Sequence, residues 1–558
     1  MAREIAIGQQ DYAAIIEKNS FYVDKTFFIK DWWNDPTFCT VILRPRRFGK
    51  TLTMSMMEYF FSTKHAGRAD LFEGLYIWEH EEFRALQGIY PVINITLADI
   101  KEKTHEGAIN EIKLIIQSIF NSFTYLADSD KLTSIDKKRF EAHIENPAVE
   151  SLARSLRFLS ELLYKHHGKK VLIFLDEYDT PMQEAFSSGY WNEIVEFIKN
   201  MFNATFKTNP YLEKSLITGI TRVSKESIFS DFNHVSIVST LSKQYETSIG
   251  FTEEEVLAAM DEYGLTEKEK VKFWYDGFTF GNHSAMYNPW SIINYLKYQE
   301  FKPYWANTSS NGLVSLVLRQ ASPELKMEME RLLDGKSIKT SIDEQLIFDN
   351  LTGGGEDVST YSLLLASGYM TGTLLVNDED EGEIYNIRIT NHETRRMFKS
   401  LIKKWFSGRH NQYNRFVTAL LAGSLEEMNY YMANVSSNVF SFFDTGINAA
   451  ENFYHAFTLG LMVELRDRYI ITSNRESGFG RYDIMLEPRN KNSDDAIIIE
   501  FKVFKEMHED TLKDTAAAAL KQIEEKQYAA VLMEKGISAE KIRKYGFAFK
   551  GKDVLIAE

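Results

Sequence analysis

The sequence predicts an α/β protein with several domains. One stretch near the N-terminus and another near the C-terminus alternate short apolar runs rich in Val and Ile with longer amphipathic segments. Such runs are typical of buried strands, and the segments between them of helices. The length of 558 residues suggests about three or four domains. Polar residues suited to phosphate chemistry stand where several of the predicted strands end.

The first such strand, residues 38–43, leads into the turn Arg44-Pro45-Arg46-Arg47-Phe48-Gly49-Lys50-Thr51 and a helix over 52–61. Backbone N–H groups of such a turn, with the helix N-terminus, bind phosphate. Lys50 is expected to reach the β- and γ-phosphates of a nucleotide and Thr51 to bind Mg²⁺. Arg44 stands where the motif has its first glycine, so a chance Gly-Lys-Thr sequence is the alternative. The residues expected to line the nucleotide are Arg46, Arg47, Phe48, Gly49, Lys50 and Thr51.

A second strand, residues 171–175, runs into Asp176 and Glu177. This is the Walker B pattern, in which Asp176 would hold Mg²⁺ and Glu177 would polarise the attacking water. A strand over 90–97 lies between the two motifs, and one over 215–220 ends in Thr221 and Arg222. Arg222 is interpreted either as a nucleotide-binding residue or as an ordinary salt-bridge arginine, and both interpretations stay open.

Near the C-terminus, the strand Ala496–Val503 carries Glu500 and Lys502, which alternation places on one face. A strand over 480–486 carries Asp483, and the polar loop that follows predicts a hairpin with Asp483 beside Glu500. Carboxylates hold hard cations such as Mg²⁺, and a lysine can stabilise developing negative charge. A solvated ion pair is the alternative for Glu500 and Lys502.

Two predicted helices flank this hairpin. The first, around 446–465, carries Glu451 and His455, and the second, around 511–528, carries Gln522 and Lys526. Residues four apart lie on one face of a helix. His455 is interpreted as a packed or hydrogen-bonded histidine and not as a metal ligand.

This order of helix with Glu, strand with Asp, strand with Glu-x-Lys and helix with Gln resembles the PD-(D/E)XK nuclease superfamily. The resemblance covers roughly Phe443 to Glu558, in the form fused to bacterial AAA-ATPase-like proteins. It implies that Glu451, Asp483 and Glu500 are metal ligands. It also implies that Lys502 is the catalytic lysine and that Gln522 organises the site or contacts substrate. Tyr482 stands where a proline often precedes the aspartate of the family.

The turn around Lys50, together with Tyr22-Val23-Asp24-Lys25-Thr26, closely resembles the bacterial AAA-ATPase-like family. Two further segments also look like that family: Tyr275-Asp276-Gly277-Phe278 and Tyr287-Asn288-Pro289-Trp290. We interpret both as segments that pack in the protein interior. The resemblance implies a P-loop ATPase domain of the ASCE class over 1–245 and a helical lid over 246–350. A connector over 351–435 and a restriction-endonuclease-like α/β domain over 436–558 would complete the chain.

The expected connector contains a helix over 360–371, strands over 373–377 and 383–390, and a second helix through 406. Thr390 and Glu393 have the spacing of a capping box at the start of that helix. Helix, hairpin and helix resemble a winged-helix module. The acidic hairpin tip favours a structural or interaction role over DNA binding.

Composition limits the possible partners and location. The net charge of −15 is unusual for a dedicated nucleic-acid coat, since phosphate contact needs clustered Lys and Arg. Nucleic acid would then bind to a local basic patch, such as the lysines near the C-terminus. The alternative is that these lysines only form part of the solvated surface. The single cysteine, Cys39, suggests a reducing compartment. With no apolar run of membrane-spanning length, we expect a cytoplasmic protein without a membrane partner.

Together, these patterns predict an ATP- and Mg²⁺-dependent ATPase coupled to a metal-dependent nuclease. DNA is favoured over RNA as the substrate. The sequence does not give the oligomeric state, and a homo-oligomer is one option because ATPases of this class often assemble. A role in defence or in control of mobile elements follows from the resemblance. The alternative is an NTP-dependent regulatory switch whose C-terminal domain binds a partner or nucleic acid without cleaving it.

Overall fold

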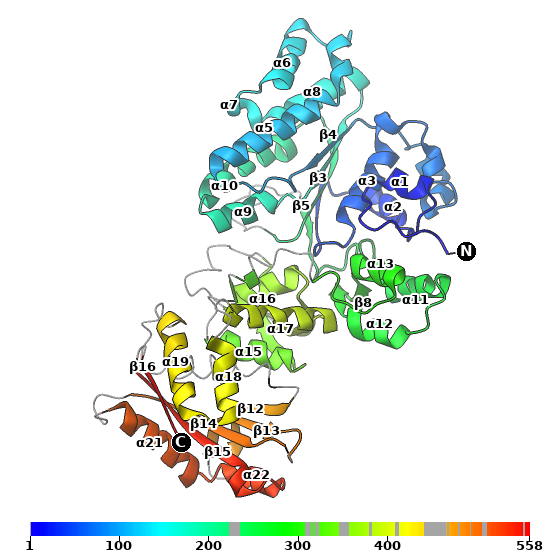
Figure 1. Ribbon diagram of the computed structural model, residues 1–558. Coiled ribbons are helices and arrows are strands. Elements are labelled where there is room, and N and C mark those ends of the chain that lie inside the picture. Colours follow the sequence, from blue (N-terminus) through cyan, green and yellow to red (C-terminus); the bar gives the residue numbers. More distant parts are fainter. Residues whose placement is uncertain are drawn as a thin grey trace. The chain divides into compact units, whose positions relative to one another are not determined.

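The computed structural model divides the chain into two compact units (Figure 1). The first comprises Met1–Gln320 with Leu332–Met397, and the second Ala321–Arg331 with Phe398–Glu558. The structure describes residues 2–222, 235–306, 314–315, 317–318, 323–344, 357–378, 382–407, 412–439, 465, 468–477, 480–491, 493–504, 511–550 and 553–558.

A five-stranded parallel sheet in the order β2-β3-β4-β1-β5 forms the centre of the first unit. Its strands are β1 (Cys39–Leu43), β2 (Val92–Thr96), β3 (Val171–Asp176), β4 (Leu212–Gly219) and β5 (Val235–Val238). β4 therefore lies between the strand that precedes the Gly-Lys-Thr turn and the strand that ends in Asp176. Because ligands bind outside the carboxyl ends of strands in open α/β sheets, this order brings both motifs to one edge.

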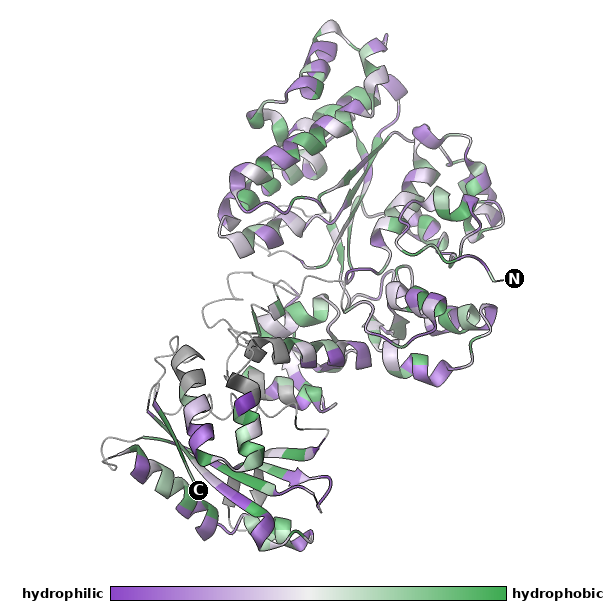
Figure 2. Cartoon of the chain, viewed as in Figure 1, coloured by the Kyte–Doolittle hydropathy of each residue, from purple (hydrophilic) through white to green (hydrophobic). Residues whose placement is uncertain are grey.

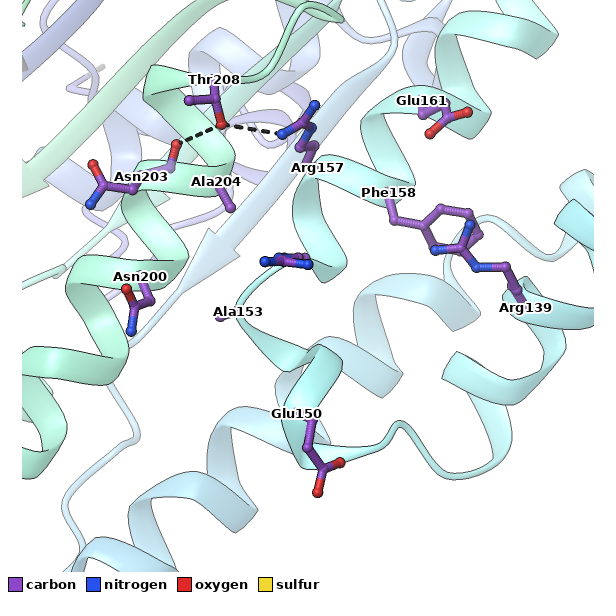
Figure 3. A pocket seen from close by; sticks show the side chains of 11 residues that line it. Arg139, Glu150, Ala153, Arg157, Phe158, Glu161, Asn200, Asn203, Ala204 and Thr208 are labelled. Carbon is purple, nitrogen blue, oxygen red and sulfur yellow. Dashed lines mark hydrogen bonds between the residues drawn. The ribbon is translucent and has the colours of Figure 1, made fainter.

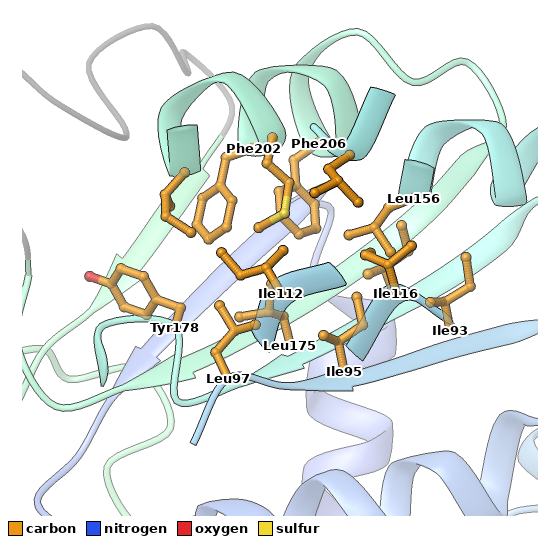
Figure 4. Close-up of a cluster of buried hydrophobic side chains, with 14 of the residues drawn as sticks. Ile93, Ile95, Leu97, Ile112, Ile116, Leu156, Leu175, Tyr178, Phe202 and Phe206 are labelled. Carbon is orange, nitrogen blue, oxygen red and sulfur yellow. The ribbon is translucent and has the colours of Figure 1, made fainter. Parts of the chain in front are cut away.

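One face of this sheet packs against α5 (His105–Asn121), α8 (Ser155–His167) and α10 (Trp191–Phe202). Figure 4 shows Ile112 and Ile116 of α5 above Ile95 and Leu175 of the strands. Phe174 points to the other face, where its ring lies 5.9 Å from that of Trp32. Apolar residues follow the strands (Figure 2), as expected for a parallel sheet covered on both faces.

Shorter helices complete this region. The α-helices are α1 (Tyr12–Glu17), α2 (Phe27–Asn34), α3 (Lys50–Phe61), α4 (Glu81–Arg84), α6 (Ser134–Glu145), α7 (Val149–Leu152) and α9 (Thr180–Ser188). A π-helix, η5 (Asn203–Lys207), directly continues α10. The 3-10 helices are η1 (Thr63–His65), η2 (Ala69–Leu71), η3 (Tyr76–Glu79) and η4 (Thr124–Asp128).

The region expected to form a helical lid also contains a small sheet. Its antiparallel strands, in the order β6-β8-β7, pack with three helices around Trp274, Tyr275 and Tyr295. The elements are β6 (Phe251–Thr252), α11 (Glu253–Glu262), α12 (Lys268–Tyr275), β7 (Phe278–Phe280), β8 (His283–Tyr287) and α13 (Pro289–Tyr298).

The expected helix, hairpin and helix follow as α16 (Asp357–Ala366), β10 (Met370–Asp378), β11 (Gly382–Ile389) and α17 (His392–Ser407). Strand β9 (Ile338–Ser341) adds to the hairpin. The expected capping box is wrong. Asn391 Oδ1 accepts the Thr394 N–H at 3.0 Å, and Thr390 Oγ1 donates to the Gly368 carbonyl instead. The Glu393 carboxylate does not cap this helix, because it binds the backbone around Trp305.

The second unit is built on a mixed sheet in the order β12-β13-β14-β15-β16. β14 and β15 are parallel and the other pairs antiparallel. Its strands are β12 (Tyr469–Ser477), β13 (Gly480–Pro488), β14 (Ala496–Val503), β15 (Ile542–Lys550) and β16 (Asp553–Ala557). Its helices are α15 (Pro323–Leu333), α18 (Gln412–Ala422), α19 (Leu425–Val439), α21 (Leu512–Glu525) and α22 (Ala529–Glu534), with η9 (Ala539–Lys541).

The two faces of β14 pack against different helices. Ile497, Ile499 and Phe501 belong to the core formed with α18 and α19. Ile498 belongs to a second core, with Ile523 of α21. Because side chains alternate along a strand, Glu500 and Lys502 share the face of Ile498 and lie toward α21.

Within the described parts of the chain, no helix is both long and apolar enough to cross a membrane.

Candidate functional site

The Gly-Lys-Thr turn connects the carboxyl end of β1 to α3. Gly49, the N-cap residue of α3, has φ +97°, a left-handed conformation that glycine adopts without steric cost. The Lys50 ammonium donates to the carbonyl oxygens of Arg44 and Pro45 at 2.9 and 3.0 Å. Burial lowers the pKa of Lys50, and the charges of Glu177 and Asp176 oppose that effect. The loop thus holds a buried cation at the N-terminus of a helix, an arrangement that suits the predicted binding of phosphate.

Asp176 links the two nucleotide motifs. Thr51 Oγ1 donates to its Oδ2 at 2.6 Å, and the Glu177 N–H donates to its Oδ1 at 3.0 Å. Thr218 Oγ1, on the neighbouring strand β4, also donates to Asp176 Oδ1. The structure therefore brings together Thr51 and Asp176, the residues predicted to hold Mg²⁺. Their hydroxyl and carboxylate oxygens suit that cation.

Glu177 has an unusual backbone conformation. Its φ of +52° is left-handed, although the residue is not glycine, and such conformations cost on the order of 1–3 kcal/mol and cluster at functional sites. Thr180 Oγ1 donates to Glu177 Oε2 at 3.2 Å. The turn after β3 therefore gives Glu177 a defined position beside Asp176.

Arg44, which replaces the first glycine of the motif, is fully buried. Its Nη1 donates to the carbonyl of Ser239 at 2.7 Å and its Nη2 to that of Tyr245 at 3.2 Å. The guanidinium also lies 4.5 Å from the centre of the Phe280 ring. Burial lowers the pKa of Arg44, and Glu246 opposes this effect. The side chain anchors the loop over 44–51, called the phosphate loop below, to the segment that follows β5.

The carbonyl of Arg46 is held from two sites far along the chain. Asn288 Nδ2 donates to it at 3.2 Å and Trp305 Nε1 at 3.0 Å. Asn288 also caps α13 through the Trp290 N–H at 2.9 Å. The Tyr287-Asn288-Pro289-Trp290 motif therefore has a definite role, which is to attach α13 to the phosphate loop.

The side chains of the loop point to several partners. Arg46 Nη2 donates to Gln183 Oε1 at 3.2 Å. The Arg47 guanidinium lies 4.8 Å from the Trp290 ring centre. The Phe48 ring packs at 4.8 Å against that of Phe278, from the Tyr275-Asp276-Gly277-Phe278 motif. Arg47 and Phe48, predicted to line the nucleotide, thus pack against the small-sheet region through their side chains.

Glu393 supports this arrangement from α17. It is 1% exposed, and its carboxylate accepts the Trp305 N–H at 2.6 Å, the Ala306 N–H at 3.3 Å and the Ser291 hydroxyl at 2.8 Å. Burial raises the pKa of Glu393 to about 7 despite these hydrogen bonds. Glu393 positions the backbone of Trp305, whose indole then reaches Arg46.

Arg222 lies after β4 and lines a small pocket with Ser239, Asp343 and Glu344. Its neighbour Thr221 is held by Asp179, whose Oδ2 accepts the Thr221 N–H and hydroxyl, both at 2.9 Å. The assignment of Arg222 to the nucleotide stays a prediction.

The second candidate site lies on β13, β14 and α21. The register pairs Ile484 with Ile499, so Asp483 and Glu500 are the next residues along the two strands. Asp483 Oδ2 accepts the Phe501 N–H at 2.8 Å. Glu500 is 2% exposed and accepts the side-chain amide of Gln522. Lys502 Nζ donates to Gln522 Oε1 at 2.8 Å.

Gln522 is the centre of this group, because its amide contacts both Glu500 and Lys502. Its Nε2 also lies 3.4 Å from the Tyr528 hydroxyl. Burial raises the pKa of Tyr528, and the charges of Glu500 and Asp483 raise it further. Four residues predicted separately, on two strands and a helix, therefore converge. The alternative interpretation of Glu500 and Lys502 is a solvated ion pair, whereas Glu500 is buried and the Gln522 amide links the two residues.

The third predicted acid, Glu451, and its neighbour His455 lie outside the described residues. Among the residues that are described, no three His, Cys, Asp or Glu side chains form a group that could hold a metal ion. Asp483 and Glu500 supply hard oxygen donors suited to Mg²⁺, and they sit beside the lysine and amide that the predicted chemistry needs.

Several site residues were not predicted from the sequence. Thr218, which binds Asp176, is a polar residue in an apolar strand, and that pattern is its only local signal. Asp179, Trp305 and Glu393 act through partners that are distant in sequence, so no spacing rule identifies them.

The first unit thus places Lys50, Thr51 and Asp176 at the carboxyl edge of a parallel sheet, and the second places Asp483, Glu500 and Lys502 on a mixed sheet. Residues 6–229 match the family model described as predicted AAA-ATPase, and residues 449–558 match the PD-(D/E)XK nuclease superfamily. The chain therefore joins an AAA-ATPase-like domain to a domain of the PD-(D/E)XK nuclease superfamily.

A related protein comes from Azotobacter chroococcum mcd 1, where it is described as an uncharacterized protein in the vnfD 5' region. It is 25% identical over 377 residues, which cover 66% of this chain. The match spans 64% of the length of that protein.

Proposed function

We propose that this protein binds and hydrolyses ATP and that its nucleotide state controls a Mg²⁺-dependent nuclease in the second unit. The observation that carries the nuclease proposal is that Gln522 contacts both Glu500 and Lys502, while Asp483 lies opposite Glu500 on the neighbouring strand. The membership of residues 449–558 in a nuclease superfamily supports it independently. Nucleic acid, DNA in preference to RNA, is the proposed substrate.

In the proposed nuclease chemistry, Asp483 and Glu500 hold the cation and Lys502 faces the reacting phosphate. When bound, Mg²⁺ supplies charge neutralisation at the phosphate and lowers the pKa of a water molecule. Gln522 keeps Lys502 and Glu500 in fixed positions through its amide. The ammonium of Lys502 stabilises the negative charge that develops on the phosphate oxygens.

In the proposed ATPase chemistry, Lys50 contacts the β- and γ-phosphates, and Thr51 with Asp176 holds Mg²⁺. Glu177 accepts a proton from the attacking water and orients it. Thr218 and the Glu177 N–H keep the Asp176 carboxylate oriented. Gln183 accepts a hydrogen bond from the Arg46 guanidinium at 3.2 Å. This bond holds one positively charged side chain of the loop in position.

The nuclease proposal is tested by incubating the full chain with plasmid DNA, single-stranded DNA and RNA, with Mg²⁺ or with EDTA. We expect Mg²⁺-dependent cleavage by the wild type and a loss of about 10²-fold or more in Asp483→Ala and in Lys502→Ala. Lys526→Ala is the matched control, because Lys526 is an exposed lysine at the C-cap of the neighbouring helix α21. Cleavage that is unchanged in both site variants would refute the assignment.

The alternative function is a nucleotide-dependent switch whose C-terminal domain binds nucleic acid or a protein without cutting. This alternative remains open because, among the described residues, the site around Gln522 contains two carboxylates and no third metal-binding side chain. Metal-dependent binding of DNA by a wild-type chain that releases no product, with or without ATP, would favour it. A role in defence or mobile-element control is proposed from family resemblance alone.

A further inference from the structure

The AAA-ATPase-like domain contains a pocket lined by arginines, and no residue of the phosphate loop belongs to this lining. Its volume is about 750 Å³, within the range of small-molecule sites. Figure 3 shows Asn200, Asn203 and Ala204 on one wall and Arg157 and Phe158 on the other. The full lining is Arg139, Glu150, Ala153, Arg154, Arg157, Phe158, Glu161, Asn200, Asn203, Ala204 and Thr208.

The charges of this lining favour an anion. Arg139, Arg154 and Arg157 contribute three guanidinium groups, and in the described part of the chain none of them forms a salt bridge. Of the two carboxylates, Glu161 is already neutralised by Lys165 at 2.7 Å. The pocket is therefore locally positive in a chain whose net charge is −15. Such a concentration of unpaired arginine is costly unless a ligand or solvent neutralises it.

Two of the guanidinium groups are held in place by neutral partners. The Arg139 guanidinium lies 4.1 Å from the centre of the Phe158 ring. Arg157 Nη1 donates to Thr208 Oγ1 at 3.2 Å. Stacking on a ring face leaves the N–H edge of a guanidinium free to bind oxyanions. Arginine is suited to phosphate in this way because its planar fork donates two parallel hydrogen bonds.

The walls that carry these groups are rigid. Phe158 is 5% exposed, and α8 packs on the central sheet through Leu156, Leu159 and Leu163. The opposite wall is where α10 passes into the π-helix η5, and π-turns occur frequently at functional sites. Asn200 and Asn203 add amides, and Glu150 adds an acceptor for hydroxyl or amino groups.

We propose that this pocket binds a phosphorylated small molecule of nucleotide size, as a second ligand site of the domain. The arginines would contact the phosphate, and the amides with Glu150 would contact the remainder of the ligand. A polynucleotide backbone shares the phosphate chemistry. The small molecule is preferred because the arginines gather around one local concavity and not along a continuous basic groove. The proposal stands on this pocket alone and is independent of the ATPase and nuclease assignments.

The test uses the full chain with Lys50→Ala, which removes the phosphate-binding cation of the loop. AMP, pyrophosphate and a single-stranded DNA oligonucleotide are titrated separately by isothermal titration calorimetry. We expect one saturable site for AMP or pyrophosphate, and weaker binding at higher salt because the contacts are ionic.

Arg154→Ala and Arg139→Ala, each added to the Lys50→Ala chain, are expected to weaken that binding about tenfold. Both residues are exposed, so their removal leaves the fold intact, which a thermal melt verifies. Arg157→Lys keeps the charge and is expected to have a smaller effect. Lys138→Ala is the matched control, since it removes one positive charge beside Arg139 on α6 from a residue outside the lining.

The proposal is overturned if neither small probe binds, or if binding survives both arginine substitutions unchanged. It is also overturned if the oligonucleotide binds while AMP and pyrophosphate do not, because the arginines then serve a polynucleotide surface. An equal loss of binding in Lys138→Ala would mean that general charge, and not this pocket, is responsible.

Discussion

The buried Glu393 gives a prediction whose size follows from its surroundings. Its carboxylate is 1% exposed and has hydrogen-bond donors around it, and its pKa is raised by burial from 4.5 to about 7. The difference between these two pKa values corresponds to about 3 kcal/mol, because a tenfold change in an equilibrium constant is worth about 1.4 kcal/mol. Replacing Glu393 by Gln puts an amide of similar shape in place of the carboxyl group and removes the titration.

The direction of the pH dependence follows from the linkage between proton binding and folding. Because the folded pKa is higher than the unfolded one, the contribution of Glu393 to stability is fully present below about pH 4.5. It is lost as the pH rises through about 7, where the carboxylate must ionise in a buried site. The unfolding free energy of the wild type, relative to Glu393→Gln, should therefore fall by about 3 kcal/mol across this window.

The assay is urea unfolding of both proteins at several pH values, followed by tryptophan fluorescence. Seven of the eight tryptophans lie within Met1–Gln320, so the signal reports on the unit that contains Glu393. The matched control is Glu196→Gln, an exposed glutamate on α10, for which a difference independent of pH is expected. A difference between wild type and Glu393→Gln that stays constant with pH would refute the reasoning.

Three further predictions concern the nucleotide site. Lys50→Ala is expected to abolish ATP binding at the loop over 44–51, because it removes the buried cation there; a calorimetric ATP affinity equal to that of the wild type would contradict this role. Glu177→Gln should retain binding but lose turnover in a phosphate-release assay, since the amide accepts no proton, and unchanged turnover would reject Glu177 as the catalytic base. Trp305→Phe removes one hydrogen bond to the Arg46 carbonyl and should weaken ATP binding by up to about tenfold; identical affinities would show that this bond does not support the loop.

Much of the site could be predicted because its signals are local. A β-branched run followed by Asp176 and Glu177, or by Glu500 and Lys502, indicates a buried strand that ends in functional groups. Alternation along β14 correctly placed Glu500 and Lys502 on one face, because side-chain direction in a strand depends on sequence position alone. The same-face prediction did not reveal that Gln522 would bridge the two residues.

Where a residue has competing partners, local rules failed. Thr390 and Glu393 have the spacing of a capping box, but Glu393 binds the backbone of Trp305 and Ala306, and Asn391 caps the helix instead. Two buried N–H groups that need an acceptor outweigh a cap that a neighbouring side chain can supply.

The sequence by itself determined the strands and the polar residues at their ends, because hydrophobic periodicity and residue order are properties of the chain. Tertiary structure alone decided what Arg44 and the Asn288 motif do. Arg44 became a buried anchor for the backbone around Ser239 and Tyr245, and Asn288 and Trp305 became supports of the phosphate loop. Burial and hydrogen-bond partners depend on segments that meet only after folding, and the free energy of a buried polar group depends on those partners.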